Sequence, residues 1–266
     1  MTPAAEQHNV VAPRSRAEAV AAFGDGEGTT VLGGGTILMP EFTARRVRPQ
    51  RVLLVAHAGL DGVQAENGRL RIGAAARIAQ LLDAAEPLGS AARAVGDPEI
   101  RAQGTVGGNL CAGAGPDFPR GDLQPALLAL GAAVRSTGAG GERTEPLEDF
   151  LAGDRDSRFV LEVELDSAGR RGAWAALDRP HAHSYTPLGV AASVDQDGGD
   201  LRIAVLGAAT YGIRLRAVEE GGLDGDPKRS LHDVRFADDA LASAWYREKM
   251  LPVLVSRVLS QLKERA

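Results

Sequence analysis

The chain of 266 residues has little cysteine, few aromatic residues and no excess of positive charge. Cys111 is its single cysteine, which excludes an intrachain disulfide and any multi-cysteine metal or iron–sulfur site within this chain. Phe, Trp and Tyr make up 4%, so a large ligand would be held mainly by backbone groups and small side chains. The formal net charge of −5 argues against nucleic acid or an anionic membrane as a partner, because both require a basic patch.

Long apolar runs and the familiar nucleotide motifs are also missing. The longest apolar run with few interruptions, residues 123–134, is too short to span a bilayer, and polar residues occupy the N-terminus where a signal peptide has its apolar core. We therefore predict a soluble, cytoplasmic protein without a membrane span. The sequence contains no P-loop, no Rossmann fingerprint and no serine-hydrolase elbow, so a nucleotide or flavin site must have another design.

Hydrophobic patterning predicts an α+β protein whose composition changes near residue 158. Ser15 and Glu18 have the spacing of a capping box, which predicts a helix from there to about Phe23. Asn67-Gly68 predicts a turn before a strand at residues 70–74. A helical pattern covers residues 238–262, with Pro252 expected to break or kink it. Further strands are expected at residues 29–32, 52–55, 132–135, 159–165, 173–177, 188–194 and 201–206, and further helices at residues 78–88, 90–95, 123–130 and 214–220.

Glycine is enriched, with 33 residues, and two short runs account for much of the excess. The first, Gly33-Gly34-Gly35-Thr36, follows a predicted strand, and the second covers residues 104–110. Consecutive glycines bring main-chain NH groups close to a ligand with no Cβ in the way, and successive NH groups turned to one side bind an anion. Two such loops suit a diphosphate carried between them. The alternative is that both are tight turns in a glycine-rich chain.

Several motifs, in the same order along the chain, resemble the FAD-binding medium subunits of the molybdenum hydroxylase family. The chain is similar to the medium subunit of carbon monoxide dehydrogenase and to the flavin domain of xanthine dehydrogenase. The resemblance runs from about residue 12 to residue 262. The motifs that carry it are Gly33–Thr36 with Leu38 and Pro40, residues 100–110, the helix motif at residues 122–132, residues 215–219, and residues 239–244 with Tyr246-Arg247.

The resemblance implies an α+β fold with an FAD-binding N-terminal portion and a C-terminal sheet-and-helix domain. The N-terminal portion, residues 1–160, would consist of two small α+β subdomains at about residues 1–56 and 57–160, and the C-terminal flavoprotein domain would cover residues 161–266. The implied activity is that of an oxidoreductase subunit that passes electrons from partner iron–sulfur clusters through FAD to an external acceptor. The implied partners are a small [2Fe-2S] subunit and a large molybdopterin subunit, because this chain cannot carry the clusters itself.

The resemblance also implies site residues, all of them cofactor-binding, with no acid–base catalyst and no metal ligand. Ile37 stands where the family usually has a short polar or acidic residue, so a polar contact is expected to be lost. The stretch between Asn109 and Asp122 is longer than usual, which makes Asp117 an alternative to Asp122 for the sugar-like chain of FAD; we favour Asp122 because the helix motif follows it directly. The implied FAD contacts are Val31, Leu32, Gly33, Gly34, Gly35, Thr36 and Ile37 at the diphosphate and adenosine end, Thr105, Gly107, Gly108 and Asn109 on the other side of the diphosphate, Asp122 on the sugar-like chain, and Val160 or Leu161 with residues near Pro187-Leu188 at the isoalloxazine.

Other interpretations of the sequence stay open at this point. His181 and His183 could bind a metal on a strand, although a polar turn at a strand end is the better interpretation because no third ligand is spaced nearby. Cys111 could couple to a flavin, but we favour a buried small hydrophobic residue. Two alternative functions are a non-catalytic binding or assembly module that keeps the fold, and a stand-alone flavin-dependent reductase.

Overall fold

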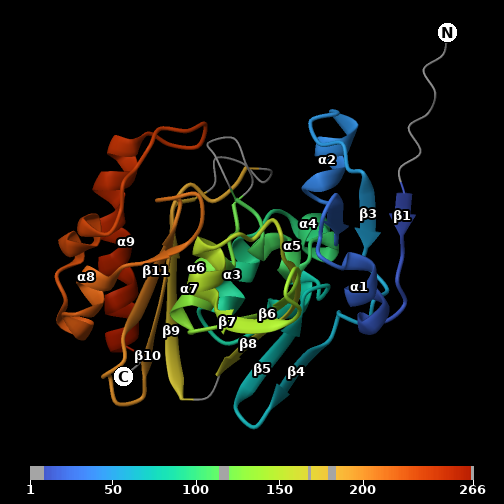
Figure 1. Ribbon diagram of the computed structural model, residues 1–266. Coiled ribbons are helices and arrows are strands. Elements are labelled where there is room, and N and C mark those ends of the chain that lie inside the picture. The colour runs from blue at the N-terminus through green and yellow to red at the C-terminus, as the bar shows by residue number, and fades with distance from the viewer. Residues whose placement is uncertain (1–8, 114–119, 167–168, 179–183, 265–266) are drawn as a thin grey trace.

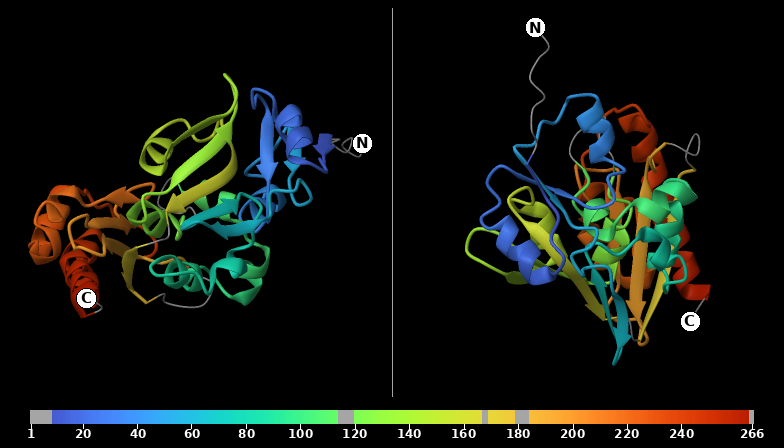
Figure 2. Two further views of the ribbon diagram at one scale, coloured as in Figure 1. Left: turned by 90° about the horizontal axis from the view of Figure 1, so that it is seen from below. Right: turned by 90° about the vertical axis from the view of Figure 1, so that its right-hand side faces the viewer.

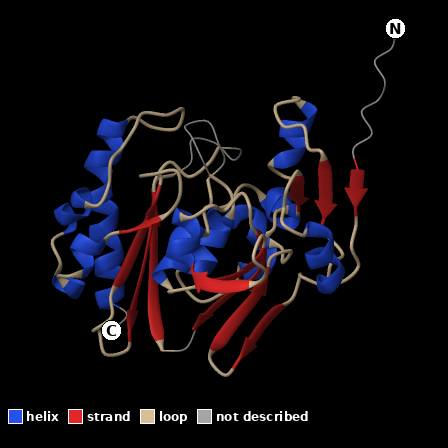
Figure 3. Ribbon diagram, in the orientation of Figure 1, coloured by secondary structure: helices blue, strands red, loops and turns tan. Residues whose placement is uncertain are grey.

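Three β-sheets lie side by side along the molecule, with the N-terminal sheet at one end and the C-terminal sheet at the other (Figures 1 and 2). The structure is a computed structural model and describes residues 9–113, 120–166, 169–178 and 184–264. Helices lie between and beside the sheets (Figure 3). The predicted α+β class is confirmed.

The N-terminal unit is a small parallel sheet of strand order β1-β3-β2, with two short helices. Its strands are β1 (Asn9–Val11), β3 (Arg51–Leu54) and β2 (Thr29–Leu32), and its helices are α1 (Arg16–Phe23) and α2 (Leu38–Thr43). The first glycine run, Gly33–Thr36, lies in the loop between the end of β2 and the start of α2. The first glycine-rich segment therefore lies at the carboxyl edge of a parallel sheet.

Helix α1 begins as its sequence predicts. Ser15 Oγ accepts a hydrogen bond from the backbone NH of Glu18 at 3.2 Å, and the Glu18 carboxylate reaches back to the backbone NH of Arg14 at 2.8 Å. Satisfying these NH groups at a helix start stabilises the first turn. Phe23, at the end of α1, is buried against Phe159 with ring centroids 5.5 Å apart. This contact packs α1 of the N-terminal unit against β8 (Phe159–Asp166) of the neighbouring sheet.

The central unit is an antiparallel sheet of order β4-β5-β8-β6-β7. Asn67 and Gly68 both have positive φ, 51° and 75°, and form the predicted turn between β4 and β5. The strands are β4 (Val63–Glu66), β5 (Arg69–Gly73), β8 (Phe159–Asp166), β6 (Ala133–Thr137) and β7 (Arg143–Pro146). The helical elements are η1 (Ile78–Leu81), α3 (Leu88–Ala94), α4 (Pro98–Gln103), α5 (Val106–Leu110), α6 (Gln124–Ala129) and α7 (Leu147–Ala152).

The C-terminal unit is an antiparallel sheet of order β12-β11-β10-β9. Its central strand β10 is buried along almost its whole length because helix α9 covers one face of the sheet and α6 of the central unit covers the other. The strands are β9 (Arg170–Ala176), β10 (Gly189–Asp195), β11 (Arg202–Leu206) and β12 (Ile213–Arg214), and the helical elements are α8 (Arg216–Glu219), η2 (Gly222–Asp224), η3 (Pro227–His232) and α9 (Ala244–Glu264).

The C-terminal helix departs from its prediction in two ways. It begins at Ala244 rather than near residue 238, and it continues through Pro252, so of the predicted break or kink the break does not occur. Apolar packing against the sheet outweighs the hydrogen bond that proline cannot donate. Trp245, which the helical spacing assigns to the apolar face, is 65% exposed instead.

Another predicted helix is shorter than expected. The expected helix at residues 78–88 is a short 3-10 helix that ends at Leu81. The expected domain boundary at residues 160 and 161 falls inside β8, which pairs with β5 as far as Asp166. No helix in the described part of the chain is both long enough and apolar enough to cross a membrane.

Candidate functional site

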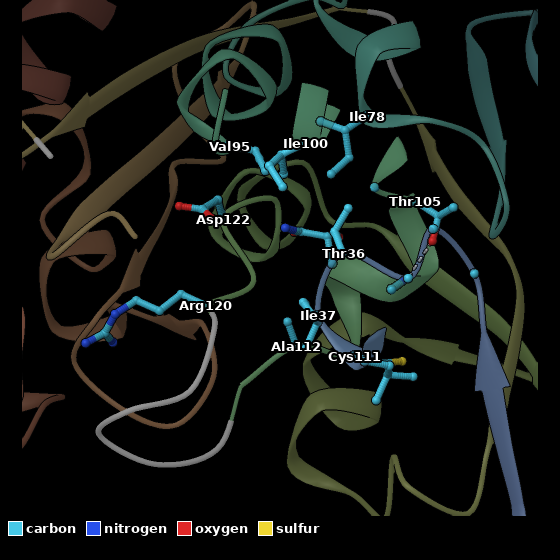
Figure 4. A pocket seen from close by; sticks show the side chains of 18 of the residues that line it. Thr36, Ile37, Ile78, Val95, Ile100, Thr105, Cys111, Ala112, Arg120 and Asp122 are labelled. Carbon is cyan, nitrogen blue, oxygen red and sulfur yellow. Dashed lines mark hydrogen bonds between the residues drawn. The ribbon is translucent and has the colours of Figure 1, made fainter. Parts of the chain in front are cut away.

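A pocket of about 310 Å³ lies where the three units meet (Figure 4). Its wall takes residues from the loop after β2, from the α4–α5 region of the central unit, and from Ser184 and Tyr185 of the C-terminal unit. Small-molecule pockets in proteins have volumes of roughly 300–1,000 Å³. Ten residues predicted from the sequence line this pocket: Val31, Gly33, Gly34, Gly35, Thr36, Ile37, Thr105, Gly108, Asn109 and Asp122.

The two glycine-rich segments lie against each other at the pocket wall. A Cβ added to Gly33 would lie 2.5 Å from Thr105 Oγ1, and one added to Gly34 would overlap the carbonyl oxygen of Gln103. Glycine is therefore required at Gly34 by the close approach of the Gln103 backbone, and at Gly33 by the close approach of the Thr105 side chain. The structure brings together two segments that are about seventy residues apart in the sequence.

The first segment presents backbone NH groups that the protein does not use. Within the described residues, the NH groups of Gly33, Gly34, Gly35 and Thr36 donate no hydrogen bond to a protein acceptor. Gly35 has φ of +75°, which turns the chain into helix α2. All four residues line the pocket, so a row of donors without protein acceptors borders it. Such a row is suited to an anion.

The second segment does not offer a comparable row. It forms the short helix α5, whose N-cap is Thr105, so the expectation that both segments bind through free NH groups is wrong. Thr105 Oγ1 accepts from the NH of Gly108, which leaves the hydroxyl hydrogen available for a ligand. The backbone NH groups are used as follows: Val106 to Ala76 O at 2.9 Å, Gly107 to Ala74 O at 2.8 Å, Gly108 to Thr105 Oγ1 at 3.2 Å, and Asn109 to Thr105 O at 2.9 Å.

Several predicted contact residues do not line the pocket: Leu32, Gly107, both alternatives Val160 and Leu161, and Pro187 and Leu188 themselves. Gly107 is buried, and a Cβ there would lie 2.9 Å from the Cβ of Ala74, so this glycine serves packing. Leu161 is fully buried in the cluster that contains Phe23, because a bulge in the β6–β8 pairing turns it toward α1. Leu32 ends strand β2 without reaching the pocket.

Asn109 and Asp122 lie on the wall where α5 approaches α6. Asn109 Oδ1 accepts from the backbone NH of Leu123 at 2.9 Å, which fixes the turn that carries Asp122. Asp122 is 3% exposed and faces the pocket. Asp117, the alternative to Asp122, lies outside the described residues, as do His181 and His183.

The sequence did not predict the apolar part of the wall, and from the C-terminal unit it predicted only residues near Pro187-Leu188, whereas Ser184 and Tyr185 line the pocket. Ile78, Val95 and Ile100 come from three separate elements, so no local pattern marks them as neighbours. Burial raises the pKa of the Tyr185 hydroxyl, and the charges of Asp122 and Glu41 add to this, so Tyr185 is neutral at physiological pH. The other lining residues that the sequence did not predict are Leu38, Gly96, Gly104, Cys111, Ala112, Arg120 and Ser184.

Cys111 is not the buried hydrophobic residue that we expected. Its side chain is exposed, and it lines the pocket at the end of α5. Within the described residues, no group of three or more His, Cys, Asp or Glu side chains is arranged to hold a metal ion.

Most of the residues that line this pocket lie in a segment that matches a known protein family. Residues 6–165 match the family of FAD binding domains in molybdopterin dehydrogenases. The chain belongs to this family. The match ends one residue before the end of β8, so it covers the N-terminal and central units together. It confirms the resemblance seen in the sequence, the cofactor FAD, and the assignment to a dehydrogenase flavoprotein, an oxidoreductase component.

Named relatives extend the likeness over nearly the whole chain. The alpha subunit of the 6-hydroxypseudooxynicotine dehydrogenase complex of Paenarthrobacter nicotinovorans is 29% identical over 91% of this chain and 89% of its own length. The medium chain of carbon monoxide dehydrogenase from Hydrogenophaga pseudoflava is 28% identical over 94% of each protein. A solved structure of that dehydrogenase, which lacks the Mo-pyranopterin moiety of the molybdenum cofactor, has a chain that superposes with a TM-score of 0.85 at 24% identity. The match covers 98% of both chains, which shows the same fold.

Proposed function

We propose that this chain holds FAD in the pocket, with the diphosphate against the NH groups of Gly33 to Thr36. The observation that carries this proposal is the row of NH groups without protein acceptors, at a place where any side chain on Gly33 or Gly34 would collide with the neighbouring segment. A diphosphate supplies the acceptors that these donors lack.

The remaining parts of the wall suit the rest of the cofactor. The Thr105 hydroxyl and the side-chain amide of Asn109 lie beside the proposed diphosphate site and can donate to it. Asp122 can accept a hydrogen bond from a hydroxyl of the sugar-like chain. Leu32, Gly107 and Leu161 support these segments from behind rather than contacting FAD, and Ile37 contributes apolar surface where the family has a polar group.

We propose that the FAD-binding portion comprises the N-terminal and central units and ends at the end of β8, near residue 166. This moves the boundary predicted from the sequence by a few residues, because β8 is a single strand within one sheet. The C-terminal unit then closes the pocket through Ser184 and Tyr185.

We propose further that the chain works as one subunit of a complex with a small [2Fe-2S] subunit and a large molybdopterin subunit. The names of the relatives, a complex subunit and a medium chain, support this arrangement, and a chain with one cysteine cannot hold the clusters. The chemistry that bound FAD supplies is the relay of electrons from those clusters to an external acceptor. The cytoplasmic location remains a prediction from the sequence.

The substitution Gly108→Leu tests the cofactor site. Gly108 is an exposed residue of α5 on the pocket wall, and an added Cβ meets only Thr105 Oγ1, at 2.9 Å, so a leucine side chain enters the pocket. Gly62→Leu is the matched control, because Gly62 is exposed, has ordinary φ and is distant from the pocket. Flavin content is measured from the absorption spectrum of each purified variant, and folding from its thermal unfolding.

Gly108→Leu is expected to lose FAD while the protein stays folded, because the gain of about 0.5–1 kcal/mol from replacing a helical glycine offsets part of the cost of shifting Thr105 Oγ1, which the new Cβ would approach to 2.9 Å. Gly62→Leu is expected to keep FAD. If a stably folded Gly108→Leu protein retains FAD at the level of the control, the cofactor does not occupy this pocket and the proposal fails.

A further inference from the structure

Arg120 is a cation in the pocket wall that the proposed FAD contacts leave unused. Its side chain is 12% exposed, and Nη2 donates to a carboxylate oxygen of Asp239. Within the described residues, Nε is buried without an acceptor and Nη1 donates no hydrogen bond. A guanidinium carries five N–H donors, so within the described residues Arg120 has donors on Nε and Nη1 that no protein group accepts.

Asp239 holds this guanidinium from behind and is itself held firmly. Its Oδ1 accepts from Arg247 Nη2 at 2.5 Å and from the backbone NH groups of Leu241 and Ala242 at 2.8 and 3.1 Å. The side chain of Asp239 is 7% exposed and that of Arg247 is 1% exposed. A carboxylate with so many donors cannot swing away, so Arg120 is held in one place.

Arg247 also fixes the other side of the pocket wall. Its Nε donates to the carbonyl oxygen of Pro187 at 3.1 Å, two residues after Tyr185. One buried guanidinium on α9 therefore anchors both Arg120, through Asp239, and the segment that carries Ser184 and Tyr185. This arrangement is typical of residues that orient a binding site rather than merely fill a core.

Arg120 serves a different part of the pocket from the glycine run. Figure 4 shows Arg120 and Asp122 on the side of the pocket away from Thr105, which lies against Gly33. Asp122 also interacts electrostatically with the Arg120 guanidinium. A cofactor whose diphosphate lies at the glycine run therefore presents another of its parts to Arg120 and Asp122.

We propose that Arg120 is a positioning residue for FAD, preset by Asp239 and Arg247 to donate to an oxygen in the ribityl–isoalloxazine part of the cofactor. This inference rests on the proposed function, because it assumes that the diphosphate binds the NH groups of Gly33 to Thr36. A fixed positive charge near the isoalloxazine favours the reduced cofactor, which carries more negative charge, over the oxidised one. Arg120 thus both tightens binding and raises the reduction potential of the bound flavin.

The test compares Arg120→Gln and Arg120→Lys with Arg170→Gln in the full chain. Arg170 is the matched control because its side chain is 10% exposed and pairs with Asp200 at 2.8 Å, yet it does not line the pocket. Dissociation constants for FAD, FMN and ADP are measured by calorimetry. The midpoint potential of bound FAD is measured by anaerobic equilibration with redox dyes, and thermal unfolding confirms that each variant is folded.

Arg120→Gln is expected to weaken FAD and FMN by about 10- to 100-fold, the effect of losing a hydrogen bond from a charged donor. Its affinity for ADP should stay within about twofold, the size of ordinary coupling between distant sites, and its midpoint potential should be more negative. Arg120→Lys is expected to keep much of the potential and part of the affinity, since the charge remains. Arg170→Gln is expected to match the wild type in every binding measurement.

The inference is overturned if folded Arg120→Gln binds FAD and FMN like the wild type with an unchanged potential, or if ADP weakens as much as FAD, which would assign Arg120 to the diphosphate. Should Arg120→Gln fail to fold, an Arg120→Lys protein identical to the wild type in affinity and potential overturns it as well. Wild-type protein that binds no FAD would instead overturn the proposed function.

Discussion

Glycine has two distinct roles in this pocket, and the difference is visible only residue by residue. Gly33 and Gly34 are required because the segment of Thr105 lies where a side chain would be, and they line the pocket. Gly107 is required because Ala74 packs against it, and it does not line the pocket. All three glycines have the same predicted role in the sequence analysis. Their different roles depend on which neighbouring residue packs against each one, and the sequence does not contain that information.

The Asp239 carboxylate makes the stability of the fold depend on pH. Burial by itself raises the pKa of this carboxyl, but hydrogen bonds from Arg247 and from the NH groups of Leu241 and Ala242, with the nearby charge of Arg120, hold the pKa below its ordinary value of 3.8. An acid whose pKa is lower in the folded than in the unfolded protein stabilises the fold above its unfolded pKa. That stabilisation is lost as the pH falls through the folded value.

Asp239→Asn is expected to reduce the free energy of unfolding at neutral pH by about 3–5 kcal/mol, because it leaves two buried guanidinium groups without their carboxylate. The difference from the wild type should begin to shrink below pH 3.8, where the unfolded carboxyl takes up a proton, and should be lost as the pH falls through the lower pKa of the folded protein. Urea unfolding of both proteins at neutral and at acidic pH measures this. A difference that stays constant down to acidic pH would contradict the assigned role of the Asp239 charge.

At the scale of elements, the second glycine-rich segment turned out to be a helix. Thr105 followed three residues later by Gly108 has the spacing of a side-chain N-cap, and that signal was present in the sequence. Glycine has a low helix propensity, and the paired glycines therefore led us to predict a loop rather than a helix at this segment. The segment is helical because its NH groups find acceptors at Ala74 and Ala76 on the chain leaving β5, a tertiary effect that no local pattern contains.

Helix α9 depends on its packing against the C-terminal sheet rather than on its intrinsic propensity. Leu254 is fully buried in that contact, whereas its near neighbour Val253 is 40% exposed. We expect Leu254→Ala to lower the free energy of unfolding by about 2–5 kcal/mol and Val253→Ala by less than about 0.5 kcal/mol. Chemical denaturation of the two variants measures both values, and equal losses would show that the helix does not pack as described.

At the scale of the whole molecule, the sequence predicted the α+β class, the turn at Asn67-Gly68, the start of α1 and most of the glycine-bearing pocket wall. These features are local, or come from a motif that carries the family resemblance. The apolar wall of Ile78, Val95 and Ile100 could not be predicted, because it arises where separate units meet, and from the C-terminal unit only the region near Pro187-Leu188 was predicted, not Tyr185 itself. The helix is not broken at Pro252, since packing decides whether a helix tolerates proline.

The pocket itself is a property of the complete chain, because its wall takes residues from the N-terminal, central and C-terminal units. The buried Arg247 links the C-terminal helix to two segments of that wall. We therefore expect a truncated protein that ends after β8 to bind FAD more weakly than the full chain, by tenfold or more, about 1.4 kcal/mol. Equilibrium titration of FAD into both proteins measures this, provided that circular dichroism shows the shortened one to be folded. Equal affinities would contradict a contribution of the C-terminal unit.

The backbone NH groups of Gly33 to Thr36 are proposed to bind the diphosphate of FAD, and ligand titration measures this binding directly. Apoprotein is titrated in a calorimeter with FAD, and then with riboflavin, which has the isoalloxazine and ribityl chain but no phosphate. We expect one tightly bound FAD per chain and riboflavin binding weaker by at least about 100-fold, which corresponds to the loss of two or more charge-assisted hydrogen bonds. Riboflavin that binds as tightly as FAD would contradict it.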